Sequence, residues 1–234
     1  MLRRLLIPVL LSLLTFAPAH AARDFLVDAD WLATEQANNP KVIILEVRYH
    51  PHRYFTVGHI PGAIQVQRFK DLGDNDGRSI MLFPSQEDFQ ATLRRWGVND
   101  DSTLVIYDDS RSALAARLYY LLGLYGFDMA RVRVLDGGAL EWSGFNDLTK
   151  EPSQAPAPGG VTLKPANPAL FVRWEQVYDD VVSRRDPGVV LVDARPAEMY
   201  SGQIIRHAVQ GGHIPGALNV VSLDVTDPLT QKWR

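Results

Sequence analysis

Apolar and polar positions alternate along the chain in blocks that favour strands and helices in turn. Continuous apolar runs, typical of strands buried on both faces, lie at 42–47, 104–107 and 132–135. Apolar residues at helical spacing predict helices beginning after Asp28, over 86–96 and over 112–124. This alternation predicts an α/β fold with a parallel sheet and helices on both faces.

Two of these helices carry start signals. Asp28 stands before the apolar positions Trp31 and Leu32, and Ser85 stands before the helix that ends near Gly97. Aspartate and serine are preferred N-caps because their side-chain oxygens accept hydrogen bonds from the free amides of the first turn. Glycine is preferred after the last turn, where the backbone becomes left-handed.

One pattern occurs twice. The heptapeptide GHIPGAI at 58–64 returns as GHIPGAL at 212–218, and we call both the HIPGA turns. Each copy follows an apolar run that ends in an acidic residue, one further residue and an arginine, at 46–48 and at 193–195. The second of these apolar runs predicts a strand at 189–192. A repeat of this kind indicates two structural units of one design.

The repeat and its surroundings predict how the chain is divided. We expect a signal peptide at 1–21, a complete unit at 24–147, a proline-rich linker at 148–167 and a partial second unit at 168–234. The leader has an arginine pair, an apolar run and an Ala-His-Ala cleavage site, typical of export to the periplasm or medium. An uncleaved anchor is the alternative, although the apolar run is shorter than the roughly 20 residues that span a bilayer.

The spacing of residues in the first unit can be compared with that in the second. In the first unit Asp108, where the next large strand ends, follows His59; the same number of residues counted from His213 ends well past Arg234. We therefore expect the chain to be a fragment whose second copy lacks its last strands, its long helix and the loop between them.

Composition narrows the function classes. A hydrophobic share of 46% and a charged share of 22% are typical of a globular protein. The net charge of −3 argues against nucleic acid, and no membrane partner is expected once the leader is removed. The chain has no cysteine, hence no disulfide, thiol nucleophile or thiolate metal site. We expect no metal and no cofactor, because His50 and His52 lack further ligands and no phosphate loop occurs.

Together these motifs resemble the rhodanese (thiosulfate sulfurtransferase) superfamily in its tandem-domain form. The resemblance rests on the repeat and on three further motifs, VIYD at 105–108, AAR at 115–117 and VLDGG at 134–138. It implies a rhodanese-like sheet and transfer of sulfane sulfur from a small anionic donor to a thiol or cyanide-like acceptor. In such tandems a cysteine of the second unit attacks the donor, from a loop whose amides and helix N-terminus stabilise the thiolate.

The sequence departs from that pattern at the decisive place. Asp108 stands where the first unit would carry the cysteine, as is common for the inactive N-terminal unit of such tandems. We expect an exported sulfurtransferase whose catalytic cysteine lies beyond the end of this chain. The alternative is a catalytically inactive rhodanese-like module that binds an anion or a partner. Cysteine phosphatases share the fold, but they also need the missing thiol.

The loop after Asp108 holds the residues that could bind an anion. Ser110, Arg111 and Ser112 are the candidates, because they stand at the start of a predicted helix. The charges of Asp108 and Asp109 oppose an anion there, so an inert loop is the favoured interpretation.

Structural roles are expected for the duplicated residues, which are Glu46, Arg48, His59, Asp193, Arg195 and His213. A catalytic histidine is not needed in both an active and an inactive unit, so we interpret both histidines as holding the turns by local hydrogen bonds. We interpret the acid–arginine pairs as ion pairs that tie strand ends to those turns. A ligand site is the alternative, since parallel sheets bind ligands at the carboxyl ends of their strands.

Overall fold

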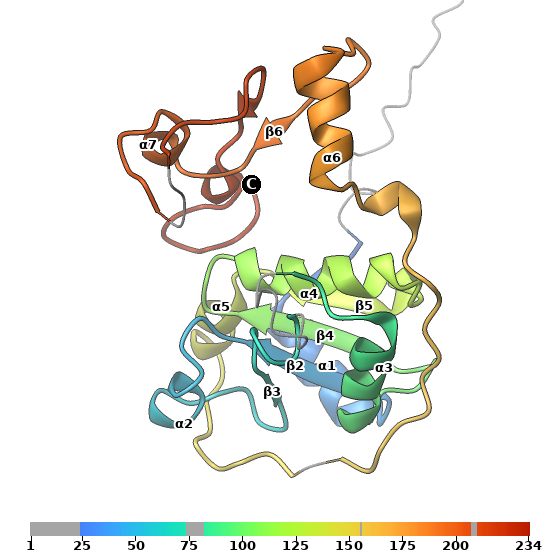
Figure 1. Cartoon of the computed structure of the whole chain (residues 1–234). Coiled ribbons are helices and arrows are strands. Elements are labelled where there is room, and N and C mark those ends of the chain that lie inside the picture. The colour runs from blue at the N-terminus through green and yellow to red at the C-terminus, as the bar shows by residue number, and fades with distance from the viewer. Residues whose placement is uncertain (1–23, 74–81, 155, 207–209) are drawn as a thin grey trace, which may run out of the picture.

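The computed structural model describes residues 24–73, 82–154, 156–206 and 210–234. A first unit contains a five-stranded sheet, and a smaller second unit contains a two-stranded one (Figure 1). The predicted signal peptide lies outside the described residues. Within the described ranges, no helix combines the length and apolar character needed to cross a membrane.

The first unit alternates strands and helices as predicted. Its elements are β1 (Leu26–Val27), α1 (Ala29–Asn38), β2 (Val42–Val47), α2 (Arg53–Thr56), β3 (Ile64–Val66), α3 (Gln86–Arg95), β4 (Thr103–Asp108), α4 (Ala113–Leu124), a 3-10 turn (Met129–Arg131), β5 (Val132–Leu135) and α5 (Gly138–Ser143). All strands are parallel, in the order β1-β5-β4-β2-β3. The carboxyl ends of β2 and β4 therefore meet at one edge, with Val47 opposite Asp108.

The start signals read from the sequence are confirmed. The Asp28 carboxylate accepts a hydrogen bond from the Trp31 amide at 2.8 Å. The Ser85 hydroxyl accepts one from the Asp88 amide at 3.1 Å. Each side chain thereby satisfies one of the free amides of its helix.

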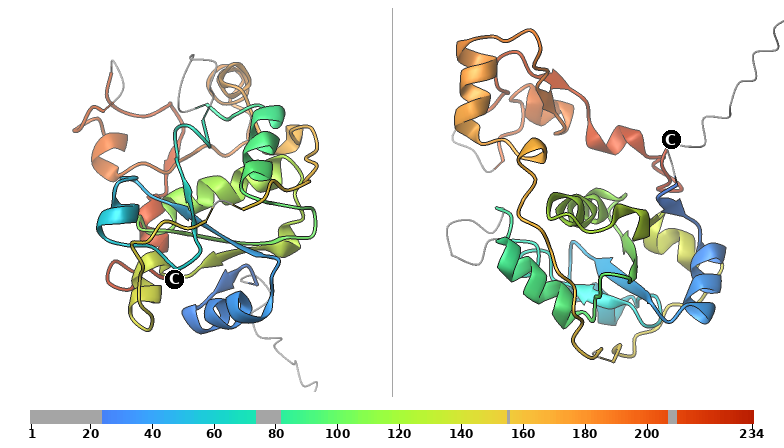
Figure 2. Two further views of the ribbon diagram at one scale, coloured as in Figure 1. Left: turned by 90° about the horizontal axis from the view of Figure 1, so that it is seen from below. Right: turned by 90° about the vertical axis from the view of Figure 1, so that its right-hand side faces the viewer.

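The sheet is buried on both faces, which confirms the predicted fold. Alternate residues of each strand enter opposite cores, so Ile44 and Val105 pack with residues of α1 and α5. Leu45 and Ile106 pack with residues of α3 and α4 on the other face. Figure 2 shows the sheet between these helices in two further views. A strand covered on both faces needs apolar residues at successive positions, which explains the continuous apolar runs.

The proline-rich segment 148–167 lies along the first unit. Val161 and Leu163 are buried in the larger core. Its backbone is held as well, because the Val161 amide donates to Val98 O at 3.1 Å and the Lys164 amide to Tyr125 O at 2.8 Å. The segment therefore connects the two units and also covers part of the first core.

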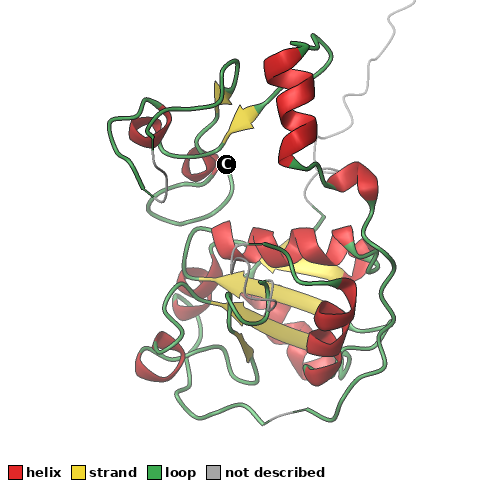
Figure 3. Cartoon of the chain, viewed as in Figure 1, coloured by secondary structure: helices red, strands yellow, loops and turns green. Residues whose placement is uncertain are grey.

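The second unit is mostly loops (Figure 3). Its elements are a 3-10 turn (Pro168–Leu170), α6 (Trp174–Val177) with its π-helical continuation (Tyr178–Ser183), β6 (Val192–Asp193), α7 (Ala197–Tyr200), β7 (Leu218–Asn219) and a second 3-10 turn (Ser222–Val225). The strand predicted at 189–192 is shorter and later than expected. Within the described residues β6 pairs with β7 alone, at 192–193, and Val190 is 68% exposed. A strand persists only where a neighbouring strand takes its hydrogen bonds.

Candidate functional site

Glu46 and Arg48 form a buried ion pair at the carboxyl end of β2. Arg48 Nε donates to Glu46 Oε1, and the two side chains are 2% and 0% exposed. The remaining Arg48 nitrogens donate to Gly58 O at 2.6 Å and to Arg53 O at 3.0 Å. The pair thus ties the strand end to α2 and to the first HIPGA turn.

His59 holds the same turn from within. Its ring stacks on Tyr54 with centroids 3.4 Å apart, and its Nδ1 lies 3.0 Å from Tyr54 O. The side chain is fully buried, and this burial lowers the pKa of His59. We therefore assign a neutral imidazole that donates from Nδ1. Tyr54 closes the turn by donating to Ala63 O at 2.6 Å.

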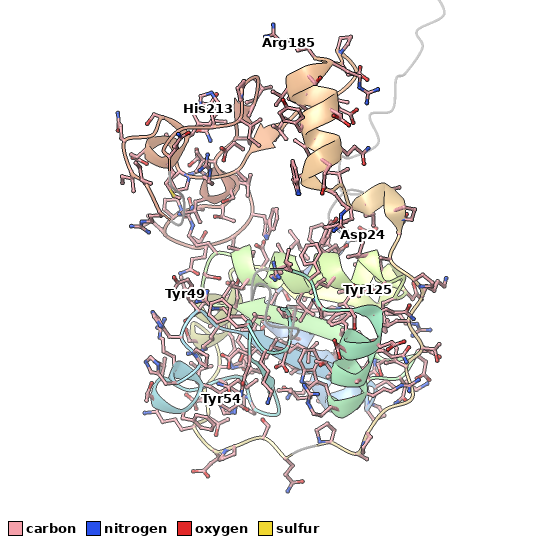
Figure 4. The ribbon with its side chains drawn as sticks, viewed as in Figure 1. Asp24, Tyr49, Tyr54, Tyr125, Arg185 and His213 are labelled. Atoms are coloured by element: carbon pink, nitrogen blue, oxygen red, sulfur yellow. The ribbon has the colours of Figure 1, made fainter. Side chains whose placement is uncertain are left out.

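The second unit repeats the ion pair, its bond to the turn and the stacked histidine. Arg195 Nε donates to both carboxylate oxygens of Asp193, at 2.9 and 3.0 Å, and Arg195 Nη2 donates to Gly212 O at 2.8 Å. His213 stacks on Tyr200 with centroids 3.7 Å apart. Figure 4 labels His213 in the second unit and Tyr54 in the first. An ion pair and a stacked histidine therefore fix the HIPGA turn in both units.

The acidic residues of the two ion pairs have pKa values shifted in opposite directions, because only the first pair is fully buried. Burial raises the pKa of Glu46 to about 7, because desolvation outweighs the attraction of Arg48. Hydrogen bonds from Arg195 instead lower the pKa of Asp193. The side chains of Asp193 and Arg195 are 12% and 39% exposed, so their charges keep part of their hydration.

The loop after β4 is wrapped around the carboxylate of Asp108. Oδ1 accepts from the amides of Ser110 at 3.1 Å and Ser112 at 2.9 Å. Oδ2 accepts from the Ser110 hydroxyl at 2.8 Å and from the amides of Leu114 and Ala115 at 2.9 and 3.0 Å. These donors and the start of α4 form an anion cradle, which we define by residues 108–115. The protein's own carboxylate, 2% exposed, fills it.

All three predicted anion-loop residues are engaged within the chain. Ser110 and Ser112 direct their amides to Asp108, and Arg111 bonds to Thr226 of the second unit. Asp109 pairs with Arg53 at 2.6 Å. The Asp108 carboxylate therefore stands where an external anion would lie.

The first unit matches a known protein family. Residues 28–144 match the family model for the rhodanese-like domain.

The chain belongs to the rhodanese family.

The chain is similar to rhodanese-family proteins that are named as sulfurtransferases. It is 31% identical over 204 residues to the 3-mercaptopyruvate sulfurtransferase of Escherichia coli K12, across 83% of this chain and 70% of that protein. It is 34% identical over 194 residues to the putative thiosulfate sulfurtransferase SseB of Mycobacterium tuberculosis CDC 1551, across 80% of this chain and 66% of that protein.

A solved rhodanese structure agrees with the fold. The crystal structure of SseA from Escherichia coli, described as a 3-mercaptopyruvate sulfotransferase, superimposes with a TM-score of 0.72 at 28% identity. The match covers 87% of this chain and 77% of that one. The similarity therefore extends beyond the first rhodanese unit into residues of the second.

Two hydrogen bonds between residues that are distant in the rhodanese sequence were not predicted. Tyr107 accepts a hydrogen bond from the Ile60 amide at 3.0 Å and so supports the HIPGA turn from β4. Trp233, near the chain end, bonds to the cradle residue Ser112 at 3.1 Å. Neither pairing leaves a local pattern, because the partners are far apart along the chain. No group of three or more potential metal-binding side chains occurs within the described ranges.

The raised pKa of Glu46 predicts that stability falls with rising pH. The folded-state pKa of about 7 lies above the ordinary 4.5, so the folded protein binds this proton more tightly. The contribution is complete below pH 4.5 and is lost as pH rises through 7. Between pH 5 and 8 we expect the free energy of unfolding to fall by about 2.5 kcal/mol through this group.

Urea unfolding across this pH range tests the prediction. Glu46→Gln should remove most of the dependence, because the amide stays uncharged throughout. Asp193→Asn in the second unit is the matched control, since the pKa of Asp193 is shifted the other way. Parallel pH profiles for Glu46→Gln and the parent would disprove the assignment.

Proposed function

We propose that this chain is part of an exported sulfurtransferase that moves a sulfane sulfur from a thiosulfate-type donor to a thiol or cyanide-like acceptor. Family membership and the names of two relatives support this class of reaction. The cradle around Asp108 is the observation that carries the proposal. Five hydrogen-bond donors converge there on one negative charge, at the carboxyl edge of a parallel sheet.

The same cradle explains what a cysteine would gain there. Amides and a helix N-terminus that hold a carboxylate would also stabilise a thiolate. The thiolate would attack the outer sulfur of thiosulfate, the S–S bond would break, and sulfite would leave with the electron pair. An acceptor nucleophile would then take the outer sulfur of the persulfide and restore the thiolate.

The reacting thiol must come from outside residues 1–234, which contain no cysteine. The second unit repeats the first unit's ion pair and turn, so we propose that its own cradle, with the cysteine, follows Arg234. The leader at 1–21 supports a periplasmic or extracellular location for the protein. Fractionation of the cells that make it would test that location.

An inactive partner-binding module is the second candidate. The filled cradle favours it, because Asp108 occupies the place of an anion and no thiol is present. Because the Asp108 carboxylate already fills the cradle, partner binding is favoured over anion binding in the first unit.

One experiment separates the two candidates. The 234-residue chain and a version extended by the downstream reading frame are assayed for sulfur transfer from thiosulfate and from 3-mercaptopyruvate to cyanide. We expect no transfer by the former, transfer by the latter, and loss when the added cysteine is changed to serine. A stop codon directly after Arg234, or an inactive extended protein, would reject the sulfurtransferase.

Asp108→Cys tests the cradle without any downstream sequence. The cradle should lower the thiol pKa, so alkylation by iodoacetamide should persist to lower pH than in the exposed control Ala197→Cys. Incubation with thiosulfate should add one sulfur atom to the intact mass of Asp108→Cys only. Equal alkylation profiles for the two variants would contradict the role given to the cradle.

A further inference from the structure

Arg111 joins the first unit to a distant part of the chain. Its guanidinium donates from Nε to the Thr226 hydroxyl at 3.0 Å and from Nη2 to Thr226 O at 2.7 Å and to Leu223 O. Thr226 is fully buried, and Ala217 is the only other buried residue among the described residues from 168 to 234. Burial in this part of the second unit is therefore concentrated where Arg111 reaches it.

Trp233 makes a second contact nearby. Its amide donates to Asp136 at 2.8 Å, its indole nitrogen donates to the Ser112 hydroxyl at 3.1 Å, and its ring meets the edge of Phe25 at 6.2 Å. Lys232 pairs with Glu141 at 2.9 Å. Figure 2 shows the C-terminus beside the start of the first unit.

These contacts are the two ends of one closed loop. Thr226 and Trp233 pair as an antiparallel bridge, and the Asp227 amide donates to Lys232 O at 2.8 Å. Both bridge residues therefore touch the first unit, and the segment is presented as one preformed element. A preformed element loses less conformational entropy on docking than a flexible chain end does.

The receiving loop adopts a backbone that few residues tolerate. Arg111 and Ser112 have φ angles of 57° and 64°, in the left-handed region that non-glycine residues occupy at a cost. The Ser112 amide is held there by Asp108 at 2.9 Å. With the cradle filled from within, the Arg111 side chain faces outward to the second unit.

We propose that the cradle loop 108–112 and the turn 136–138 form a receptor for residues 222–234, and that this contact fixes the orientation of the second unit. The receptor offers a guanidinium, a hydroxyl and a carboxylate. The docked segment offers two carbonyl groups, a threonine hydroxyl, an indole N–H and a backbone amide. Arg111 is the central positioning residue of this interface, and its role does not depend on sulfur transfer.

Distances between spin labels test this proposal. Because the chain has no cysteine, Ala37→Cys in α1 and Ala197→Cys in α7, both exposed, would be the only labelled positions. We expect one narrow distance distribution in the doubly labelled parent. Arg111→Ala should widen it about twofold or more, because interdomain orientation is mobile unless an interface fixes it. Arg133→Ala, whose bonds stay local, is the matched control and should leave the width unchanged.

A further variant keeps the test decisive. Thr226→Val preserves the side-chain shape and removes the hydroxyl that accepts from Arg111 Nε and donates to Leu223 O. It leaves the first unit intact, so it replaces Arg111→Ala in the test if Arg111→Ala fails to fold. A broader distance distribution in the variant that is used supports the receptor, and a distribution as narrow as that of the parent overturns it.

Discussion

Replacing Asp108 with alanine should destabilise the first unit by about 4 kcal/mol, since each buried donor left without a partner costs roughly 1–3 kcal/mol and entering water recovers part of this. The carboxylate accepts five hydrogen bonds, four of them from backbone amides of the loop and the first turn of α4. Those amides cannot find other protein partners without unwinding the helix start. Urea unfolding of the parent and of Asp108→Ala gives the difference directly.

Two comparisons show that the loss comes from the cradle. Asp101→Ala removes another aspartate near β4, one that is exposed and pairs with the exposed Lys41, and should change stability little. Formate should partly restore the melting temperature of Asp108→Ala, because it can enter the emptied cradle, and should leave the parent unchanged. An equal effect of formate on both proteins would show that the amides do not form an anion site.

Replacing Arg48 with alanine should cost about 3–5 kcal/mol at pH 8, where the buried Glu46 would have to remain charged without its partner. The change also leaves Gly58 O and Arg53 O without the guanidinium that they bind. The loss should shrink toward pH 5, because Glu46, whose pKa burial already raises to about 7, is then protonated.

The second unit supplies the matched control for this prediction. Arg195→Ala removes the same residue from the same motif, but Arg195 is 39% exposed and Asp193 can be hydrated once the pair is broken. We expect a much smaller loss with little dependence on pH in this range. Similar losses for the two variants would mean that burial does not set the strength of the pair.

Local patterns were sufficient for most of the first unit. The apolar run 42–47 became β2 with the predicted bounds, and Asp28 and Ser85 cap the helices that follow them. These features depend on neighbours within a few residues, because strand periodicity and capping are properties of a short stretch of backbone. The duplicated HIPGA turns were equally visible, since their ion pair, tyrosine and histidine are close in sequence.

Two outcomes depended on surroundings that no local pattern encodes. The run at 189–192 has the composition of a strand but is paired only at its end, because β6 has a single neighbouring strand within the described residues. The acid–arginine pairs have one sequence pattern but opposite pKa shifts, since the first is buried by packed elements and the second keeps contact with water.

By itself, the sequence determined the family fold, the repeat and the absence of a thiol, because these follow from residue identity and short-range spacing. Only the tertiary structure decided what the loop after β4 does. Folding closes that loop on the Asp108 carboxylate and brings Thr226 and Trp233 to Arg111 and Ser112 across more than a hundred residues of chain. Hydrogen bonds between such distant groups depend on the whole fold to set their distances, so no stretch of sequence could reveal them.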